Sequence, residues 1–355
     1  MKESLRIDSH KLIFHPGRVH DWLAGRSISP IYLEIAPSGT CNHRCIFCAL
    51  DYLNYKPVFL DLPALKKTLR QAAALGVKSV MYAGEGEPLL HKQIDDIVSF
   101  TKARGIDVAM TSNGVLLKEP LAKKILKSLS WIRISLNAGR AQTYARVHRT
   151  HPQDFGRVLE NLQDVVAIRD RQHLKTTIGV QLLLIPENVG EVFSLATTLK
   201  KIGVNYLTIK PYSQHPMSHS RIPPRFAYAD HLAMDRRLQK IADQDFHIIF
   251  RSETMKRVSV MKDYERCLGL PFWGYIDAKG EVYACSAFLG QKDFSYGNIY
   301  RQDFKDIIRG RRRQDVIRSV SSQLDVAKCR QVCRLDKINS YLWELTHPGP
   351  HVNFI

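Results

Sequence analysis

The residues in this chain whose types and spacing could do chemistry are its seven cysteines. Cys41, Cys45 and Cys48 follow one another in a C-x3-C-x2-C pattern. This spacing lets one short loop place thiolates at three corners of an iron–sulfur cube and leaves the fourth iron without a protein ligand. Zinc usually takes four protein ligands, or three and a water, in paired spacings that this loop fits poorly. The loop therefore predicts a cluster with one coordination site open to a substrate or cofactor.

The other cysteines lie toward the C-terminal end of the chain and could hold a second metal centre. They are Cys267, Cys285, Cys329 and Cys333. Four thiolates can coordinate all four iron atoms of a cluster and leave no iron open to another ligand. Zinc in a four-cysteine site stays an alternative, because sequence does not separate the two metals. Between the first two of these cysteines, residues 273–284 alternate like strands around a turn at 277–280, which predicts a hairpin.

Apolar, strand-like runs alternate with amphipathic, helix-like stretches from residue 31 to about 215. The expected strands are 31–36, 79–82, 107–110, 133–137, 179–185 and 206–210. The expected helices are 62–75, 94–104, 121–128, 155–169 and 192–202. Six β–α pairs of this kind imply a parallel sheet, with an active site at the carboxyl ends of the strands. Further on, the sequence predicts a linker at 216–235, a helix at 234–243 and a strand at 247–251.

Three polar motifs end successive expected strands after the cysteine loop. They are AGEGEP at 83–88, TSNG at 111–114 and RISLN at 133–137. In this order, and with Phe47 directly before the last cysteine of the loop, they resemble the radical S-adenosylmethionine (radical SAM) superfamily. The sequence departs from the family at Ala83, where glycine is usual, at the extra Glu85, and at Asn137, where aspartate is common.

The resemblance implies an α/β fold, a partial (β/α)6 barrel similar to part of a TIM barrel. It also implies that Cys41, Cys45 and Cys48 hold a 4Fe–4S cluster and that SAM binds at its open iron. By the same resemblance, polar groups and glycines at the strand ends bind SAM. In this chain they are Gly84, Glu85, Gly86, Glu87, Ser112, Asn113, Ser135 and Asn137.

The C-terminal cysteine pattern is similar to the small α+β auxiliary-cluster domain of radical SAM enzymes that is called twitch, the half-size form of SPASM. It implies a second, auxiliary 4Fe–4S cluster on the four C-terminal cysteines. Cys329 and Cys333 have three residues between them where two are usual. The resemblance therefore does not settle whether all four cysteines bind the auxiliary cluster. We expect an N-terminal extension at 1–30, the barrel at 31–235, the auxiliary domain at 236–337 and a docking tail at 338–355.

By this resemblance the protein is an enzyme that cleaves SAM reductively to a 5′-deoxyadenosyl radical, which abstracts a hydrogen atom from the substrate. An auxiliary cluster that accepts an electron favours dehydrogenation of a small polar, phosphorylated or nucleotide-linked molecule, such as a sugar or cyclitol. An epimerase would need a free cysteine, and two full ligand sets leave none. Lys210, His215 and Arg251 lie at or near strand ends and are candidate catalytic residues, although such residues are more often on the surface.

The net charge of +18 at pH 7 indicates an anionic partner. A small anionic substrate is favoured. Peptide modification stays open, although about 30 residues before the first strand are too few for a winged-helix recognition domain. RNA modification also stays open, although RNA-methylating relatives lack auxiliary clusters. A zinc-stabilised nucleic-acid-binding protein is the non-enzymatic alternative, and binding of nucleic acid is not favoured.

The family implies an external one-electron reductant of the flavodoxin or ferredoxin type. No apolar run approaches the roughly 20 residues that cross a bilayer, and the first residues lack the apolar core of a signal peptide. An odd number of cysteines also argues against a disulfide framework. These features predict a cytoplasmic protein without a membrane span.

Overall fold

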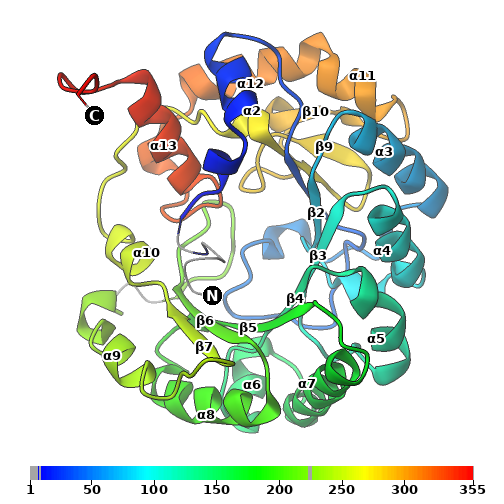
Figure 1. Ribbon diagram of the computed structural model, residues 1–355, viewed down its shortest axis with the longest axis vertical. Coiled ribbons are helices and arrows are strands. Elements are labelled where there is room, and N and C mark those ends of the chain that lie inside the picture. The colour runs from blue at the N-terminus through cyan, green and yellow to red at the C-terminus, as the bar shows by residue number, and fades with distance from the viewer. Residues whose placement is uncertain (1–6, 8, 223–225, 355) are drawn as a thin grey trace.

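The computed structural model describes residues 7, 9–222 and 226–354. Strands curve into an incomplete ring, and helices cover its outer side (Figure 1). The strands are β1 (Tyr32–Ile35), β2 (Ser79–Tyr82), β3 (Asp107–Ser112), β4 (Trp131–Ser135), β5 (Thr177–Leu184), β6 (Tyr206–Pro211), β7 (His247–Phe250), β8 (Trp273–Ile276), β9 (Glu281–Tyr283) and β10 (Ser295–Asn298). The α-helices are α2 (Pro16–Leu23), α3 (Leu62–Ala74), α4 (Ile94–Ala103), α5 (Glu119–Ile125), α6 (Ala141–His148), α7 (Gln153–Arg171), α8 (Val192–Ile202), α9 (Met234–Leu238), α10 (Ser252–Arg257), α11 (Phe304–Arg309), α12 (Arg311–Gln323) and α13 (Asp336–Thr346).

The strands form one sheet in the order β10-β9-β8-β1-β2-β3-β4-β5-β6-β7. Neighbours from β1 to β7 are parallel, and β8 pairs parallel with the free edge of β1, with Tyr32 opposite Trp273. Strand β9 pairs antiparallel with β8 on one side and with β10 on the other. The predicted partial barrel with a small C-terminal α+β domain is confirmed. The auxiliary segment continues the barrel sheet through β8.

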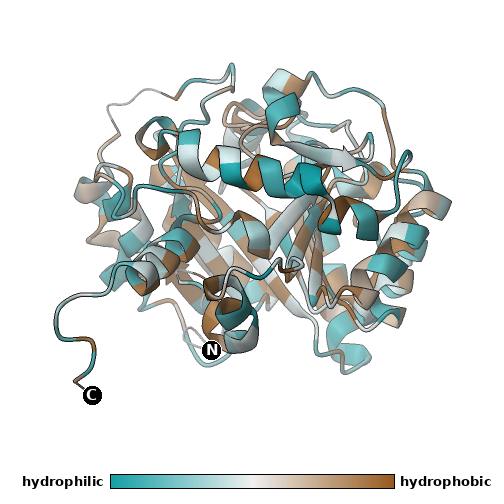
Figure 2. Ribbon diagram, turned by 90° about the horizontal axis from the view of Figure 1, so that it is seen from above, coloured by the Kyte–Doolittle hydropathy of each residue, from teal (hydrophilic) through white to brown (hydrophobic). Residues whose placement is uncertain are grey.

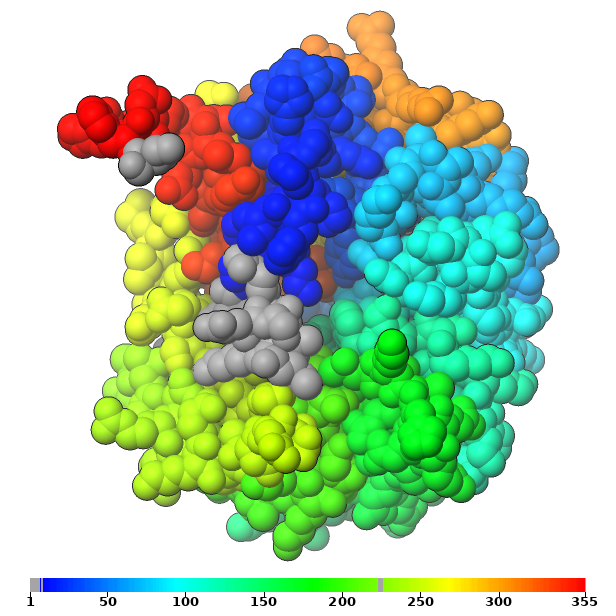
Figure 3. All heavy atoms as spheres, in the orientation of Figure 1, coloured from blue at the N-terminus to red at the C-terminus, as the bar shows by residue number. Residues whose placement is uncertain are grey.

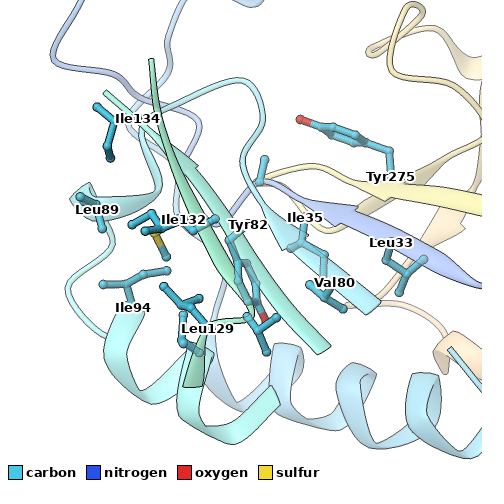
Figure 4. Close-up of a cluster of buried hydrophobic side chains, with 14 of the residues drawn as sticks. Leu33, Ile35, Val80, Tyr82, Leu89, Ile94, Leu129, Ile132, Ile134 and Tyr275 are labelled. Atoms are coloured by element: carbon cyan, nitrogen blue, oxygen red, sulfur yellow. The ribbon is translucent and has the colours of Figure 1, made fainter. Parts of the chain in front are cut away.

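The local sequence explains the regular elements. Helix α3 begins where the Asp61 carboxylate accepts a hydrogen bond from the Ala64 N–H over 2.9 Å, a typical N-cap. Its apolar positions, such as Leu65 and Leu69, are fully buried. Apolar side chains of β1, β2 and β4 point toward the helices, including Ile132 from β4 (Figure 4). The outward faces of the helices are mostly hydrophilic, which leaves the apolar core between sheet and helices (Figure 2).

Several expected elements differ in length from the structure. The helix expected at 234–243 is the short α9, and the strand expected at 247–251 is β7, which extends the parallel sheet beyond β6. The hairpin expected at 273–284 is present as β8 and β9, and Gly280 in its turn has a φ of 77°, a value that favours glycine. Part of the expected linker, residues 223–225, lies outside the described residues.

Segments near the two ends of the described chain pack together on one face of the molecule. The N-terminal segment and α13 lie side by side (Figure 3). The helix α2 contributes Val19 to a small core that contains Phe272 and Leu342 of α13. The expected docking tail therefore packs through its helix. Its last residues do not: Phe354 is 82% exposed, because the segment after α13 extends away from the body. No helix among the described residues is both long and apolar enough to cross a membrane.

Candidate functional site

The loop with the first three cysteines lies across the carboxyl ends of the parallel strands. It follows β1 directly, and hydrogen bonds hold its backbone to the ends of neighbouring elements. The N–H of Glu87, after β2, donates to Thr40 O over 2.8 Å. The N–H of Ile46 donates to Val147 O, near the end of α6, over 2.9 Å. The strand ends thus fix the cysteine loop from two sides.

The carboxylate of Glu87 joins its own motif after β2 to the TSNG motif at the end of β3. It is buried and accepts hydrogen bonds from the Ser112 hydroxyl over 2.7 Å, from the Asn113 N–H over 2.8 Å and from the Leu89 N–H over 3.1 Å. Burial raises the pKa of Glu87, and these donors oppose that rise. The Asn113 amide also donates to Asn42 Oδ1 of the cysteine loop over 2.7 Å. The structure brings these predicted SAM residues together, and it uses Glu87 to connect β2, β3 and the loop.

Two glycines let the chain pass close to its neighbours at this point. A Cβ at Gly86 would collide with the backbone carbonyl oxygens of Ser38 and Thr40. At Gly84, where φ is 117°, a Cβ would stand 2.5 Å from the Tyr275 hydroxyl. Glycine is therefore required at both positions by close approach of the cysteine loop and the hairpin.

Glu85 lies at the junction of the barrel and the hairpin. Its Oε1 accepts a hydrogen bond from the Ala278 N–H, in the turn between β8 and β9, over 2.9 Å. Burial, followed by the negative charge of Asp277, raises the pKa of Glu85 to about 7. The residue that departs from the family motif thus connects the β2 end to the auxiliary segment.

The substitution Glu85→Gln should make the chain more stable at alkaline pH. The folded pKa of about 7 is above the unfolded value of about 4.3. The folded state therefore binds more protons between these values, and the wild-type free energy of unfolding falls as the pH rises through them. Gln keeps the acceptor for Ala278 but removes this loss of free energy of unfolding, about 3–4 kcal/mol at pH 8. Anaerobic urea unfolding at pH 5 and pH 8 measures the free energy of unfolding of both proteins.

The matched control is Glu160→Gln on the exposed side of α7, which should leave the pH dependence unchanged. Equal pH dependence in wild type and Glu85→Gln would contradict the raised pKa of Glu85.

The end of β4 is anchored by side-chain contacts. Asn137 is buried, and its Oδ1 accepts from the Leu183 N–H over 2.7 Å. Its backbone oxygen accepts from the Asn188 amide over 2.9 Å, and its N–H donates to His148 Nε2 over 3.3 Å. Ser135 is half-buried on the same strand. The structure places both at the expected edge, with Asn137 engaged by the chain itself.

The first three cysteines have the donor chemistry of a metal centre. Cys41, Cys45 and Cys48 are half-buried and lie close enough to act electrostatically on one another. Burial, followed by the charge of Glu87, raises the pKa of Cys41 to about 12. Thiols in such a place ionise together when a metal supplies positive charge. The three sulfurs therefore fit an iron–sulfur cluster.

The four C-terminal cysteines also form one group. They come from the segments before β8, after β9 and before α13, and Cys285 is acted on by the charges of the other three. Burial raises the pKa of Cys267 and of Cys333 to about 12. Asn339 Nδ2 donates to Cys267 Sγ over 3.6 Å, and the Ala287 N–H donates to Cys285 Sγ over 3.3 Å. Four converging sulfurs with amide donors fit an all-cysteine cluster.

Basic side chains converge on the inner side of the strand ring. On β4 the residues on either side of Arg133 pack toward the helices, so Arg133 points inward. Lys210 comes from the end of β6 and Arg251 directly follows β7. Arg330 and Arg334 come from the segment of the last two cysteines. We call these five residues the cationic cluster.

Three members of the cationic cluster, Arg133, Lys210 and Arg330, have little opposite charge beside them. Arg334 pairs with Glu34 of β1 over 2.6 Å and is 40% exposed, so water reaches this space. Burial, followed by the charges of the four arginines, holds the pKa of Lys210 well below its usual range. Within the described chain, no carboxylate lies within ion-pair distance of Arg133, Lys210 or Arg330. The arrangement is suited to an anionic ligand.

The three candidate catalytic residues are not all brought together. Lys210 and Arg251 share the cationic cluster, whereas His215 stacks on Tyr52, with ring centroids 5.5 Å apart. His215 is buried, its Nδ1 accepts from the Met217 N–H over 3.2 Å, and burial lowers its pKa to about 4.

Sequence reasoning missed three members of the cationic cluster. Arg133 lies within the RISLN motif, two positions before Ser135 on the same strand face. Arg330 and Arg334 flank Cys333 in the sequence. Their position next to a predicted ligand was a signal, because a cluster-binding loop lies close to the active site.

Comparison with known proteins agrees with this geometry. Residues 35–207 match the radical SAM superfamily, and residues 267–334 match the SPASM iron-sulfur cluster-binding domain. The chain belongs to the radical SAM superfamily and is a radical SAM enzyme with a C-terminal SPASM domain. Its cofactors are a 4Fe–4S cluster, SAM and an auxiliary cluster.

The sequence relatives are nucleotide cyclases by name. Identity is 27% over 194 residues with the GTP 3′,8-cyclase of Chlorobaculum tepidum, covering 54% of this chain and 56% of that protein. It is 28% over 212 residues with a probable GTP 3′,8-cyclase of Thermococcus kodakarensis, covering 59% and 66%. The match spans less than two thirds of the length of either relative.

Solved structures share the fold. SuiB of Streptococcus suis bound to S-adenosylmethionine superposes with a TM-score of 0.65 at 18% identity, over 80% of this chain and 67% of that one. The structure of anSMEcpe with bound AdoMet gives a TM-score of 0.58 at 15% identity, over 88% of each chain. At these identities the likeness concerns the fold alone.

Proposed function

We propose that this radical SAM enzyme acts on a small phosphorylated molecule of the nucleotide or sugar type and releases it in an oxidised form. The observation that carries the proposal is the cationic cluster inside the strand ring. It gathers one lysine and four arginines, with Glu34 paired to Arg334. Arg133, Lys210 and Arg330, which have no carboxylate within ion-pair distance in the described chain, cost folding free energy unless an anion binds, since desolvated like charges repel one another.

We assign the ligands by position in the two sulfur groups. Cys41, Cys45 and Cys48 hold the cluster that binds SAM, and the four C-terminal cysteines hold the auxiliary cluster. When bound, cluster and SAM supply a 5′-deoxyadenosyl radical that abstracts a hydrogen atom from the substrate. Gly84 and Gly86 let the hairpin and the cysteine loop pack close to the β2 end, where SAM would bind, and Glu87 keeps that loop in place.

The cationic cluster would orient the substrate through its phosphate groups. Arg330 and Arg334 can each bind phosphate oxygens with two parallel N–H donors, and Lys210 can act as a point charge. A bound phosphate supplies the negative charge that is missing beside Lys210, and so favours its positive form. The names of the sequence relatives support a nucleoside triphosphate, with GTP as the first candidate.

The oxidative outcome rests on the second sulfur group. Four cysteines leave no iron open for a substrate, so the auxiliary cluster would accept an electron. When bound, that cluster would supply the acceptor for one electron and a base of this chain would take one proton, so that with the abstracted hydrogen atom the substrate would lose two hydrogens. Glu85, with a pKa of about 7, has the proton affinity that such a base needs near neutral pH.

Formation of 5′-deoxyadenosine by the reconstituted enzyme tests this proposal. We expect GTP, other nucleoside triphosphates, or sugar phosphates to raise the rate by about tenfold or more over SAM alone, and the matching unphosphorylated nucleosides or sugars to have no effect. Mass spectrometry should find a product two hydrogens lighter than the substrate. A product of unchanged mass would indicate cyclisation. Equal stimulation by unphosphorylated compounds or by peptides would contradict the proposal.

A further inference from the structure

A histidine outside every predicted motif contacts the first cysteine loop. His148, the last residue of α6, is 1% exposed, and its Nδ1 lies 3.3 Å from Cys45 Sγ. The backbone of the loop is held at the same place, because the Arg44 N–H donates to His148 O over 3.1 Å. The end of α6 thus supports the loop through both its backbone and its side chain.

The contact at Nε2 of His148 shows which of the two imidazole nitrogens carries the proton. The backbone N–H of Asn137 points to His148 Nε2 over 3.3 Å. A backbone amide can only donate, so Nε2 must accept with its lone pair. The imidazole proton is therefore on Nδ1, where it faces Cys45 Sγ. The geometry defines a hydrogen bond from His148 to the sulfur, in that direction.

Two aromatic contacts keep the imidazole in this orientation. The Tyr144 ring stacks on it with centroids 4.2 Å apart and planes 26° apart. The Phe47 ring meets it edge-on at 5.7 Å. The imidazole is therefore held between the β4 end and the cysteine loop, and rotation about its χ2 would break both hydrogen bonds.

We propose that His148 is a positioning residue that tunes the first cluster through its Nδ1–H hydrogen bond to the Cys45 thiolate. Reduction adds negative charge that the sulfurs share, so a donor to sulfur stabilises the reduced form more than the oxidised form. The bond therefore raises the reduction potential of the cluster that cleaves SAM. This inference rests on Cys45 as a ligand of that cluster and is independent of the substrate.

Three substitutions distinguish the effect of losing the hydrogen-bond donor of His148 from the effect of losing the packing of its ring. His148→Gln keeps an acceptor near the Nε2 position and loses the donor to Cys45. His148→Asn keeps an N–H donor near the Nδ1 position and loses the acceptor for Asn137. His148→Phe keeps the stack on Tyr144 and loses both. Tyr144→Phe is the control, because within the described chain the Tyr144 hydroxyl makes no hydrogen bond.

The experiment is an anaerobic redox titration of the full reconstituted chain, followed by electron paramagnetic resonance. The signal that changes when SAM is added belongs to the first cluster. At a fixed potential, His148→Gln and His148→Phe should lower the ratio of reduced to oxidised first cluster about tenfold, which is 59 mV for one electron. His148→Asn should stay within about threefold of wild type. The auxiliary cluster and Tyr144→Phe should not change.

Iron analysis accompanies each titration. A cluster that assembles in His148→Asn but not in His148→Gln would support the hydrogen bond as well, because only the donor separates these variants. A wild-type ratio in His148→Gln would overturn the proposal. So would an equal shift, or equal loss of the cluster, in His148→Gln and His148→Asn, since a packing role alone predicts that result.

Discussion

Replacing Cys41, Cys45 and Cys48 together by alanine should lower the iron content from about eight to about four atoms per chain. It should also abolish 5′-deoxyadenosine formation. The reason is that these sulfurs form one of two separate groups, and the second group has four sulfurs of its own. The measurement is iron per chain after anaerobic reconstitution, together with SAM cleavage under a chemical reductant.

The matched variant changes the second group. Replacing Cys267 and Cys285 by alanine should also remove about four iron atoms, but it should leave uncoupled SAM cleavage measurable. Loss of all iron in either variant would show that the two groups do not bind clusters independently. About four atoms in the wild type would remove the auxiliary cluster from the assignment.

The sequence predicts much of the fold because its signals are local. Strand β2 and helix α8 occur at the expected residues, since a short apolar run and an amphipathic stretch each define an element without distant partners. The pairing at the β8 end of the sheet could not be predicted from the sequence. Pairing of β8 with β1 joins residues more than 200 positions apart, and no periodicity in either strand indicates that register.

The candidate site, like the fold, is predictable only where its signals are local. Gly86 and Glu87 are recognisable because they stand in an ordered motif. The motif does not show that the Glu87 carboxylate accepts hydrogen bonds from Ser112 and Asn113 rather than from solvent or SAM alone. His148 has no local signal at all. It reaches Cys45 across 103 positions, and this contact exists only after α6 has packed against the cysteine loop.

The cationic cluster allows a second strong prediction, in which one change affects stability and substrate binding in opposite directions. Lys210→Met removes an amine whose charged form is disfavoured by burial and by the charges of four arginines. Because the folded pKa of Lys210 is below its unfolded value of about 10.4, the unfolded state binds more protons below that value, and the charge disfavours folding at pH 7. We expect the Tm without substrate to rise by about 2 °C or more.

Substrate binding should respond in the opposite sense to the same change. A charge-assisted hydrogen bond to phosphate contributes about 1.5–3 kcal/mol, so the KM for the phosphorylated substrate should rise about 10- to 100-fold. The control, Lys175→Met, is exposed just before β5, at the opposite end of the barrel, and should change neither quantity. The Tm difference between wild type and Lys210→Met should shrink as the pH approaches 10, because the unfolded lysine then begins to lose its proton. A lower Tm with an unchanged KM would assign Lys210 to packing and contradict an anion site.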